Sequence, residues 1–257
     1  MKGDLAWVWL FALIMVRVSG LLLVAPVLAG QYVPKKVRVF FALIFSILLC
    51  GTFSADSLPR FDTRMLPLTL TYELLIGLMI GLAFRWTMFG VAVAGEMIGL
   101  KMGLGIASVI DPGSGMQSNF VQALFLLLYS VLFVSMDGHH EMLRTFNASY
   151  LAIPPGPANL DLSCFPAVIE QTAAMFIVGV RLAGLMLIPL VLVMCAMALT
   201  ARAFPQANVF FLSYSVSLVV GLYLMSTTGP AIRMAVNYGI QQGTQDALKW
   251  IQGLAGI

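Results

Sequence analysis

Long apolar stretches separated by short polar connections are the main feature of the chain. A helix of about 20 mostly apolar residues is long enough to cross the hydrocarbon core of a membrane. We therefore predict an all-α, integral-membrane-type protein with about six to seven long apolar helices in hairpins. In chain order, the predicted spans are 5–29, 37–55, 66–92, 118–136, 172–200 and 207–228, and a glycine-rich helix is predicted at 94–110.

The polar segments predict how these helices are connected. They fall near 30–38, 56–64, 137–171 and 201–206, and 137–171 is expected to be the only long loop. The tail at 244–257 is expected to form a short amphipathic surface helix. Its apolar face holds Ala247, Leu248, Ile251 and Leu254, and its polar face holds Gln245, Asp246, Lys249 and Gln252. Because no internal repeat divides the chain, we expect one domain over 1–257.

The composition agrees with a membrane protein. The chain is 60% hydrophobic and only 10% charged, whereas soluble domains contain about 25% charged residues. The net charge of +3 is too small to indicate a nucleic-acid partner. Cys50, Cys164 and Cys195 lack the spacing of a zinc site or a disulfide framework. The first apolar run is longer than the roughly 7–15 residues of a signal peptide's apolar region, so we expect a retained helix.

Small residues recur every four positions in the glycine-rich helix. Gly95, Gly99 and Gly103, followed by Ala107, fall on one helical face, and such a strip lets another helix backbone come close. Gly77 and Gly81 form a second pair of this kind. After the strip, the residues Asp111, Pro112, Gly113, Ser114 and Gly115 cannot continue the helix. Close packing followed by an irregular segment indicates a pathway or a gate.

Several charged residues lie inside or at the ends of the apolar helices. They are Arg17, Glu73, Arg85, Glu96, Lys101 and Arg181. Charges at such depth are costly and face protein or water rather than lipid. Pairing at subunit contacts is the favoured interpretation, and an ion or proton relay in a transporter is the alternative. In the first loop, Lys35, Lys36 and Arg38 favour a cytoplasmic location of that loop by the positive-inside rule.

Patterns typical of enzymes are absent from the sequence, which has no GxSxG, HExxH or phosphate-binding loop motif. We therefore expect no catalytic residue, no cofactor and no metal. Ligand-type side chains occur between Asp137 and Glu141, but adjacent histidines such as His139 and His140 are expected to point in different directions. A further polar element near the last apolar helix could cap that helix, but capping alone does not explain its order of a basic residue, proline, glutamine, asparagine and an aromatic residue. It comprises Arg202, Pro205, Gln206, Asn208 and Phe210.

Taken in order, these elements resemble the FliR family, the flagellar biosynthetic proteins of the type III export gate. The matching segments are Arg17–Leu21 with Ala25–Val27, Val33–Val37, Ala94–Gly103, Asp111–Gly115, Gly138–His140 with Ser149 and Tyr150, Ile153–Gly156, and Arg202–Phe210. Each segment is weakly specific alone, but their number, order and spacing cover almost the whole chain. The resemblance implies a non-enzymatic subunit that packs into a hetero-oligomeric channel in the bacterial inner membrane, at the flagellar basal body.

The resemblance also implies partners and a site. The expected partners are FliP-like and FliQ-like subunits, an FlhB-like subunit, unfolded protein substrates and membrane lipid. The segment after the glycine-rich helix would be the channel plug, with Gly105, Asp111, Pro112, Gly113, Ser114, Gly115 and Gln117 as its residues. Residues 212–217 depart from the flagellar pattern, so the equivalent subunit of a virulence-type injectisome is the alternative. A stand-alone transporter is remote, because the sequence shows no two related halves.

Overall fold

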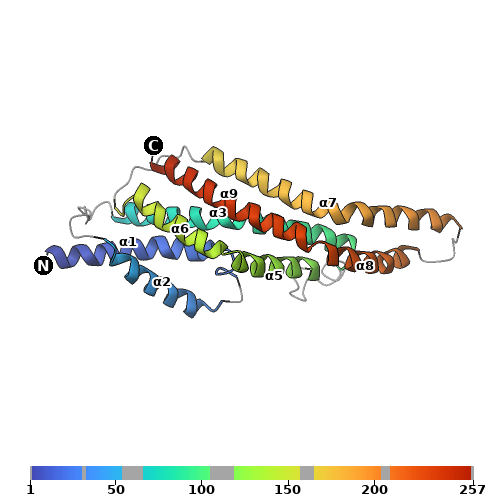
Figure 1. The fold of residues 1–257 in the computed structure, drawn as a ribbon, viewed down its shortest axis with the longest axis horizontal. Helices are drawn as coiled ribbons and strands as arrows, with labels where there is room; N and C mark the ends of the chain where they lie inside the picture. The colour runs from blue at the N-terminus through green and yellow to red at the C-terminus, as the bar shows by residue number, and fades with distance from the viewer. Residues whose placement is uncertain are drawn as a thin grey trace. The chain divides into compact units, whose positions relative to one another are not determined.

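The computed structural model describes residues 2–30, 33–53, 66–104, 119–156, 165–203 and 209–255, and this part of the chain is helical without any strand. The prediction of an all-α protein is therefore confirmed. Figure 1 shows the helices in chain order. They are α1 (Lys2–Val24), α2 (Lys35–Cys50), α3 (Leu66–Lys101), α5 (Phe120–Ser135), α6 (Gly138–Ala152), α7 (Phe165–Ala203), α8 (Val209–Thr227) and α9 (Gly229–Ala255).

One helix, α3, replaces the two helices predicted at 66–92 and 94–110. It runs unbroken for 36 residues and ends at Lys101, earlier than expected. Its inner glycines lie against neighbouring backbone: a Cβ on Gly90 would come within 2.8 Å of the Met175 carbonyl oxygen. Helix packing at this position offsets the low helix propensity of glycine, so the helix continues.

The predicted loop at 137–171 is wrong, because half of it forms α6. This helix has few apolar residues, but Met142, Phe146 and Tyr150 recur every four positions and are buried. One apolar stripe is sufficient for a helix packed on one side. The connection from α6 to α7 is correspondingly shorter than predicted.

The C-terminal helix is also longer than the sequence indicates. The expected short helix at 244–257 is the end of α9, which has 27 residues. Its predicted faces need correction at two positions, because Leu248 is 37% exposed and Asp246 only 6% exposed. Ala247, Ile251 and Leu254 are buried, as their place on the apolar face requires.

Fewer helices are long enough to cross a membrane than the six predicted spans. Among the described residues, α1, α3 and α7 qualify alone, and two bent pairs, α5 with α6 and α8 with α9, bring the total to five if each pair is one span. Helix α2 has 16 residues, which is about 24 Å at 1.5 Å per residue. That is shorter than the roughly 30 Å hydrocarbon core.

The chain forms two compact units. The first comprises 1–86, 137–171 and 239–257, where α1 packs against α2. Its largest fully buried side chains are Trp250, Arg17, Tyr72, Phe84 and Phe146. The second comprises 87–136 and 172–238. In α5 of this unit, the buried rings of Tyr129 and Phe133 stack with centroids 6.1 Å apart.

Candidate functional site

A buried ion pair joins two helices of the first unit. The Nε of Arg17 in α1 donates a hydrogen bond to the Glu73 carboxylate in α3, and both side chains are 0% exposed. The two residues are 56 positions apart in sequence, and each lies in the middle of an apolar helix segment. A lone buried charge is costly, so each of these two charges can be buried only because the other neutralises it.

The remaining polar atoms of this pair find partners at the end of α6. Arg17 Nη1 donates to Ser149 Oγ at 3.2 Å, and both terminal nitrogens donate to the Ile153 carbonyl at 3.1 Å. The guanidinium carbon lies 4.2 Å from the centroid of the Tyr150 ring. The second Glu73 oxygen accepts a hydrogen bond from the backbone N–H of Gly156 at 3.3 Å. We call this set of six residues the Arg17 network.

Each charged group of the Arg17 network is held in place by several contacts. Its carboxylate accepts two hydrogen bonds, and its guanidinium is fixed by three acceptors and an aromatic face. For Arg17 and Glu73, the contact therefore lies within the chain, and a subunit contact is not required to neutralise them. The network fixes α1, α3 and the end of α6 in one arrangement.

Glycines bring α1 and α3 into backbone contact next to this network. A Cβ on Gly20 would lie 2.6 Å from the Leu74 carbonyl oxygen, and one on Gly81 would lie 2.8 Å from that of Leu21. At Gly77, an added Cβ would overlap the Arg17 carbonyl oxygen. The structure thus places the Gly77 and Gly81 pair against α1. Gly20, which the sequence analysis did not single out, completes the contact from the other side.

The predicted glycine strip of the second unit divides between two neighbours. Gly95 lies against Gln122 and Gly99 against Asn119, both at the start of α5. Gly103 lies beyond the end of α3, with a φ of +81°, against the ring of Tyr214 in α8. This left-handed conformation suits glycine, because a side chain would be strained there. The strip therefore packs the end of α3 and turns the chain toward the predicted plug segment.

The plug residues themselves lie outside the described residues. They are Gly105, Asp111, Pro112, Gly113, Ser114, Gly115 and Gln117. Pro205, Gln206 and Asn208 of the polar element are also outside them. Arg202 and Phe210 fall in the end of α7 and the start of α8, but their side chains are not described.

The other predicted buried charges are not gathered into one cluster. Arg85 donates to the Val24 carbonyl at 3.2 Å. Glu96 accepts a hydrogen bond from the Asn119 amide at 2.9 Å, and that amide also caps α5 through the Gln122 N–H. Lys101 and Arg181 are exposed. From this set, Arg17 and Glu73 form an ion pair with each other.

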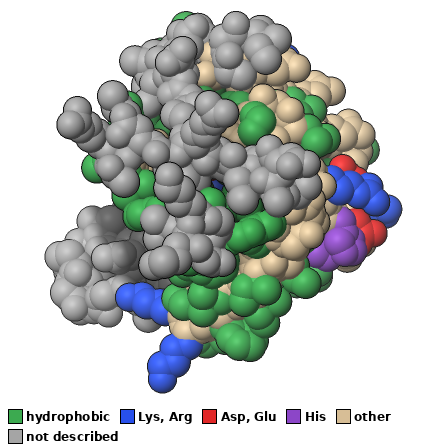
Figure 2. Space-filling view, turned by 90° about the vertical axis from the view of Figure 1, so that its left-hand side faces the viewer, with side chains coloured by type: hydrophobic (Ala, Val, Ile, Leu, Met, Phe, Trp, Pro, Cys, Tyr) green, Lys and Arg blue, Asp and Glu red, His purple; other side chains and the backbone are tan. Residues whose placement is uncertain are grey.

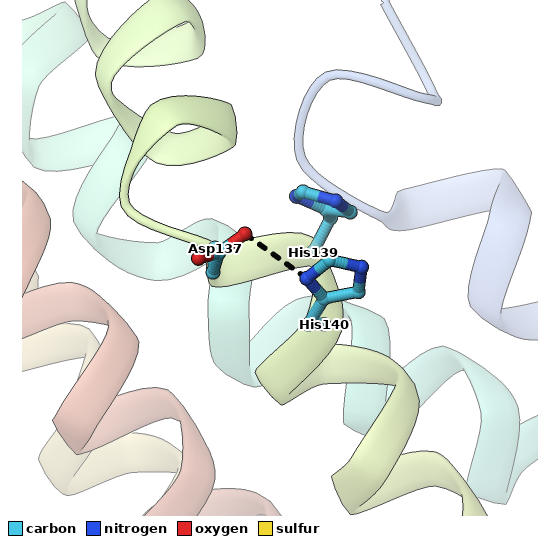
Figure 3. Close-up of side chains that lie close together, drawn as sticks. All are labelled: Asp137, His139 and His140. Atoms are coloured by element: carbon cyan, nitrogen blue, oxygen red, sulfur yellow. Dashed lines mark hydrogen bonds and ion pairs between the residues drawn. The ribbon is translucent and has the colours of Figure 1, made fainter.

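Asp137, His139 and His140 lie together at the start of α6, as Figure 3 shows. The histidine ring centroids are 4.1 Å apart, so the expectation that the rings diverge is wrong. Asp137 bonds the His140 ring at 3.0 Å. The three ligand-type atoms all lie within 4.8 Å of one another, so the group is compact enough to hold one metal ion. The positive end of the α6 dipole disfavours a cation at this position. These residues form a polar surface cluster in which Asp137 and His140 contact each other.

Sequence comparison places the chain among known proteins. The family described as bacterial export proteins, family 1, matches residues 8–243. The chain is 30% identical to the flagellar biosynthetic protein FliR of Escherichia coli K12, over 89% of this chain and 87% of the relative. It is 27% identical to the FliR of Bacillus subtilis 168, over 96% of each chain. The FliR of Caulobacter vibrioides is 27% identical, over 88% of this chain and 91% of the relative.

Proposed function

Because the chain belongs to the FliR family of bacterial export proteins, we propose that it is a channel-forming core subunit of the flagellar type III export gate. In this role it passes unfolded flagellar proteins across the inner membrane at the basal body. Membership of the FliR family, together with the apolar helices, supports a membrane subunit of the flagellar export apparatus. The family match over 8–243 is the observation that carries the proposal.

The exposed apolar surface supports assembly with other subunits. In α7, only 22% of the most apolar 18-residue stretch is buried, against 50% in α3. Arg181 lies on this helix and is exposed. A charge in an apolar face needs a polar neighbour in a membrane. FliP-like, FliQ-like and FlhB-like subunits are the partners we propose, with no catalytic step in this chain.

The plug is proposed for residues 105–117. Helix α3 leads into this segment, and the left-handed Gly103 redirects the chain just before it. The close contacts of Gly95 and Gly99 with α5 hold the end of α3 in place. Glycine and proline in the segment itself favour an irregular conformation that can change without breaking a helix.

Deleting residues 110–115 tests the plug. The assembled complex, inserted into a planar lipid bilayer, should conduct small ions when the segment is removed and stay closed when it is present. Co-purification of the partner subunits serves as the control that the variant still assembles. If the assembled variant conducts no more than the unmodified complex, the plug assignment is wrong.

An injectisome subunit and a stand-alone transporter are the two alternatives, and a different experiment tests each. The departure at 212–217 leaves the injectisome counterpart as the alternative, whereas the relatives described above are flagellar. Expression in a flagellated strain that lacks its own FliR should restore swimming if the flagellar role is right. A stand-alone transporter would give ion or solute flux from the chain reconstituted by itself, and the gate proposal expects none.

A further inference from the structure

Helix α2 presents large apolar side chains outward and small ones inward. The residues packed inside the protein are Ala42, Ser46 and Leu49. The exposed ones recur at helical spacing along one side, and Phe40 and Leu48 are 64% and 65% exposed. The complete outer face, which we call the α2 outer face, comprises Val37, Phe40, Phe41, Ile44, Ile47 and Leu48. A face of this size needs an apolar cover.

Positive charge is concentrated at the beginning of the same helix. Lys35 and Lys36 are exposed in the first turn, and Lys36 precedes Phe40 by one helical turn. Arg38 is held by the carbonyls of Gly30 and Val33, yet its Nε is buried without a hydrogen-bond acceptor among the described residues. Figure 2 shows Lys and Arg side chains in blue beside green hydrophobic side chains at the lower edge of one face.

An apolar groove runs beside Arg38 between α1 and α2. It has a volume of about 140 Å³ and is lined by Ser19, Leu22, Leu23, Arg38, Val39 and Ala42. Leu23 and Val39 are 60% and 55% exposed, so the groove is reached from outside. An apolar slot next to unneutralised positive charge matches a molecule with a hydrocarbon chain and an anionic head.

We propose that α2 is an interfacial helix whose outer face lies in the lipid bilayer and whose first turn binds the phosphate groups of anionic phospholipids. The helix is too short to cross the hydrocarbon core, and its combination of an apolar face with basic residues is typical of helices in the membrane interface. Each Lys or Arg near an anionic bilayer contributes about 1 kcal/mol of attraction. This inference does not depend on the channel role or on the plug.

Depth measurements test the position of the helix. The full chain, with Cys50, Cys164 and Cys195 replaced by serine, would carry one fluorescently labelled cysteine at Phe40, Ile44 or Leu48, in vesicles with brominated acyl chains. These positions span about 12 Å along the helix at 1.5 Å per residue. Equal, strong quenching at all three is expected. A cysteine at Arg144, which is 77% exposed beside other polar groups, should be quenched little.

Headgroup preference tests the basic turn. At the Phe40 label, brominated phosphatidylglycerol should quench better than brominated phosphatidylcholine at equal mole fraction and low salt. The double variant Lys35→Gln with Lys36→Gln should reduce this preference on the order of tenfold. The matched control is Arg233→Gln with Lys249→Gln, which removes two exposed charges from α9 and should leave it unchanged.

Three results would overturn the proposal. Absence of quenching at every α2 position would mean that water or a protein subunit covers the outer face. A steady change in depth from Phe40 to Leu48 would mean that α2 enters the membrane end-on. Equal quenching of the unmodified chain by the two lipids at low salt would mean that Lys35 and Lys36 do not bind anionic headgroups.

Discussion

The Arg17 network shows how single residues keep two charges inside an apolar protein. Glu73 has both oxygens engaged, one by Arg17 and one by the Gly156 N–H. Replacing Glu73 with glutamine keeps the shape but leaves the Arg17 charge buried without a counter-charge. Removal of one partner of such a pair costs about 3–5 kcal/mol. We therefore expect Glu73→Gln to lower the thermal midpoint of the purified chain strongly.

The double variant Arg17→Met with Glu73→Leu is the control for this prediction. Because it removes both charges and restores apolar packing, it should be much closer to the unmodified chain than Glu73→Gln alone. A double variant as unstable as the sum of the single variants would mean that the two charges are not coupled. Thermal unfolding of the unmodified chain, Glu73→Gln, Arg17→Met, Glu73→Leu and the double variant in the same detergent gives the comparison.

The sequence indicated that these residues are buried charges, but not that they pair. Arg17 and Glu73 stood out because each interrupts an apolar helix. Their partners Ser149 and Ile153 lie in a segment that lacks any strong apolar run, and the hydrogen bonds span more than 130 positions. Such contacts depend on the tertiary arrangement, which the pattern of one helix does not specify.

At the scale of the elements, apolar length is a good guide to helix existence and a poor one to helix ends. It located α5 (predicted at 118–136) and α8 (predicted at 207–228) closely, but it placed the start of α7 too late, divided α3 and missed α6. The four-residue recurrence of Met142, Phe146 and Tyr150 was the available signal for α6. The continuity of α3 could not be predicted in the same way, because contacts from α7 and α5 compensate its glycines.

The packing of α1 on α3 can be tested at Gly77. An alanine there places a Cβ into the Arg17 carbonyl and within 2.9 Å of the Leu21 nitrogen, so the helices must separate. Overpacking of this kind costs about 1–3 kcal/mol. In contrast, a Cβ at Gly184 meets no atom within 4 Å, and Gly184→Ala gains up to about 1 kcal/mol of helix propensity.

Thermal midpoints of these two variants should therefore move in opposite directions. Both replace a helical glycine with alanine, so any general effect of the substitution cancels in the comparison. If Gly77→Ala were as stable as Gly184→Ala, the close approach of α1 and α3 would not exist in the protein in solution.

At the scale of the molecule, the exposed side chains determine whether a surface is suited to contact water, lipid or a partner subunit. Figure 2 shows the purple histidines of the polar cluster at the start of α6 beside red and blue side chains. Composition predicted an apolar exterior, since 60% of the residues are hydrophobic. Composition does not indicate which apolar faces contact partner subunits and which contact lipid, because apolar side chains are buried by either.

A substitution at Arg181 distinguishes whether a partner subunit or lipid contacts the exposed face of α7. An arginine facing lipid at the centre of a helix costs about 2.5–3.5 kcal/mol, whereas one facing an acidic or carbonyl group of a partner subunit is compensated. If a partner covers this face, Arg181→Leu should reduce co-purification of the FliP-like and FliQ-like subunits and lower swimming. The thermal midpoint of the variant chain alone should not fall, since the Arg181 side chain is exposed. The neighbouring exposed Val180→Leu is the control for added bulk. Improved or unchanged recovery of partner subunits with Arg181→Leu would instead place this face of α7 in lipid.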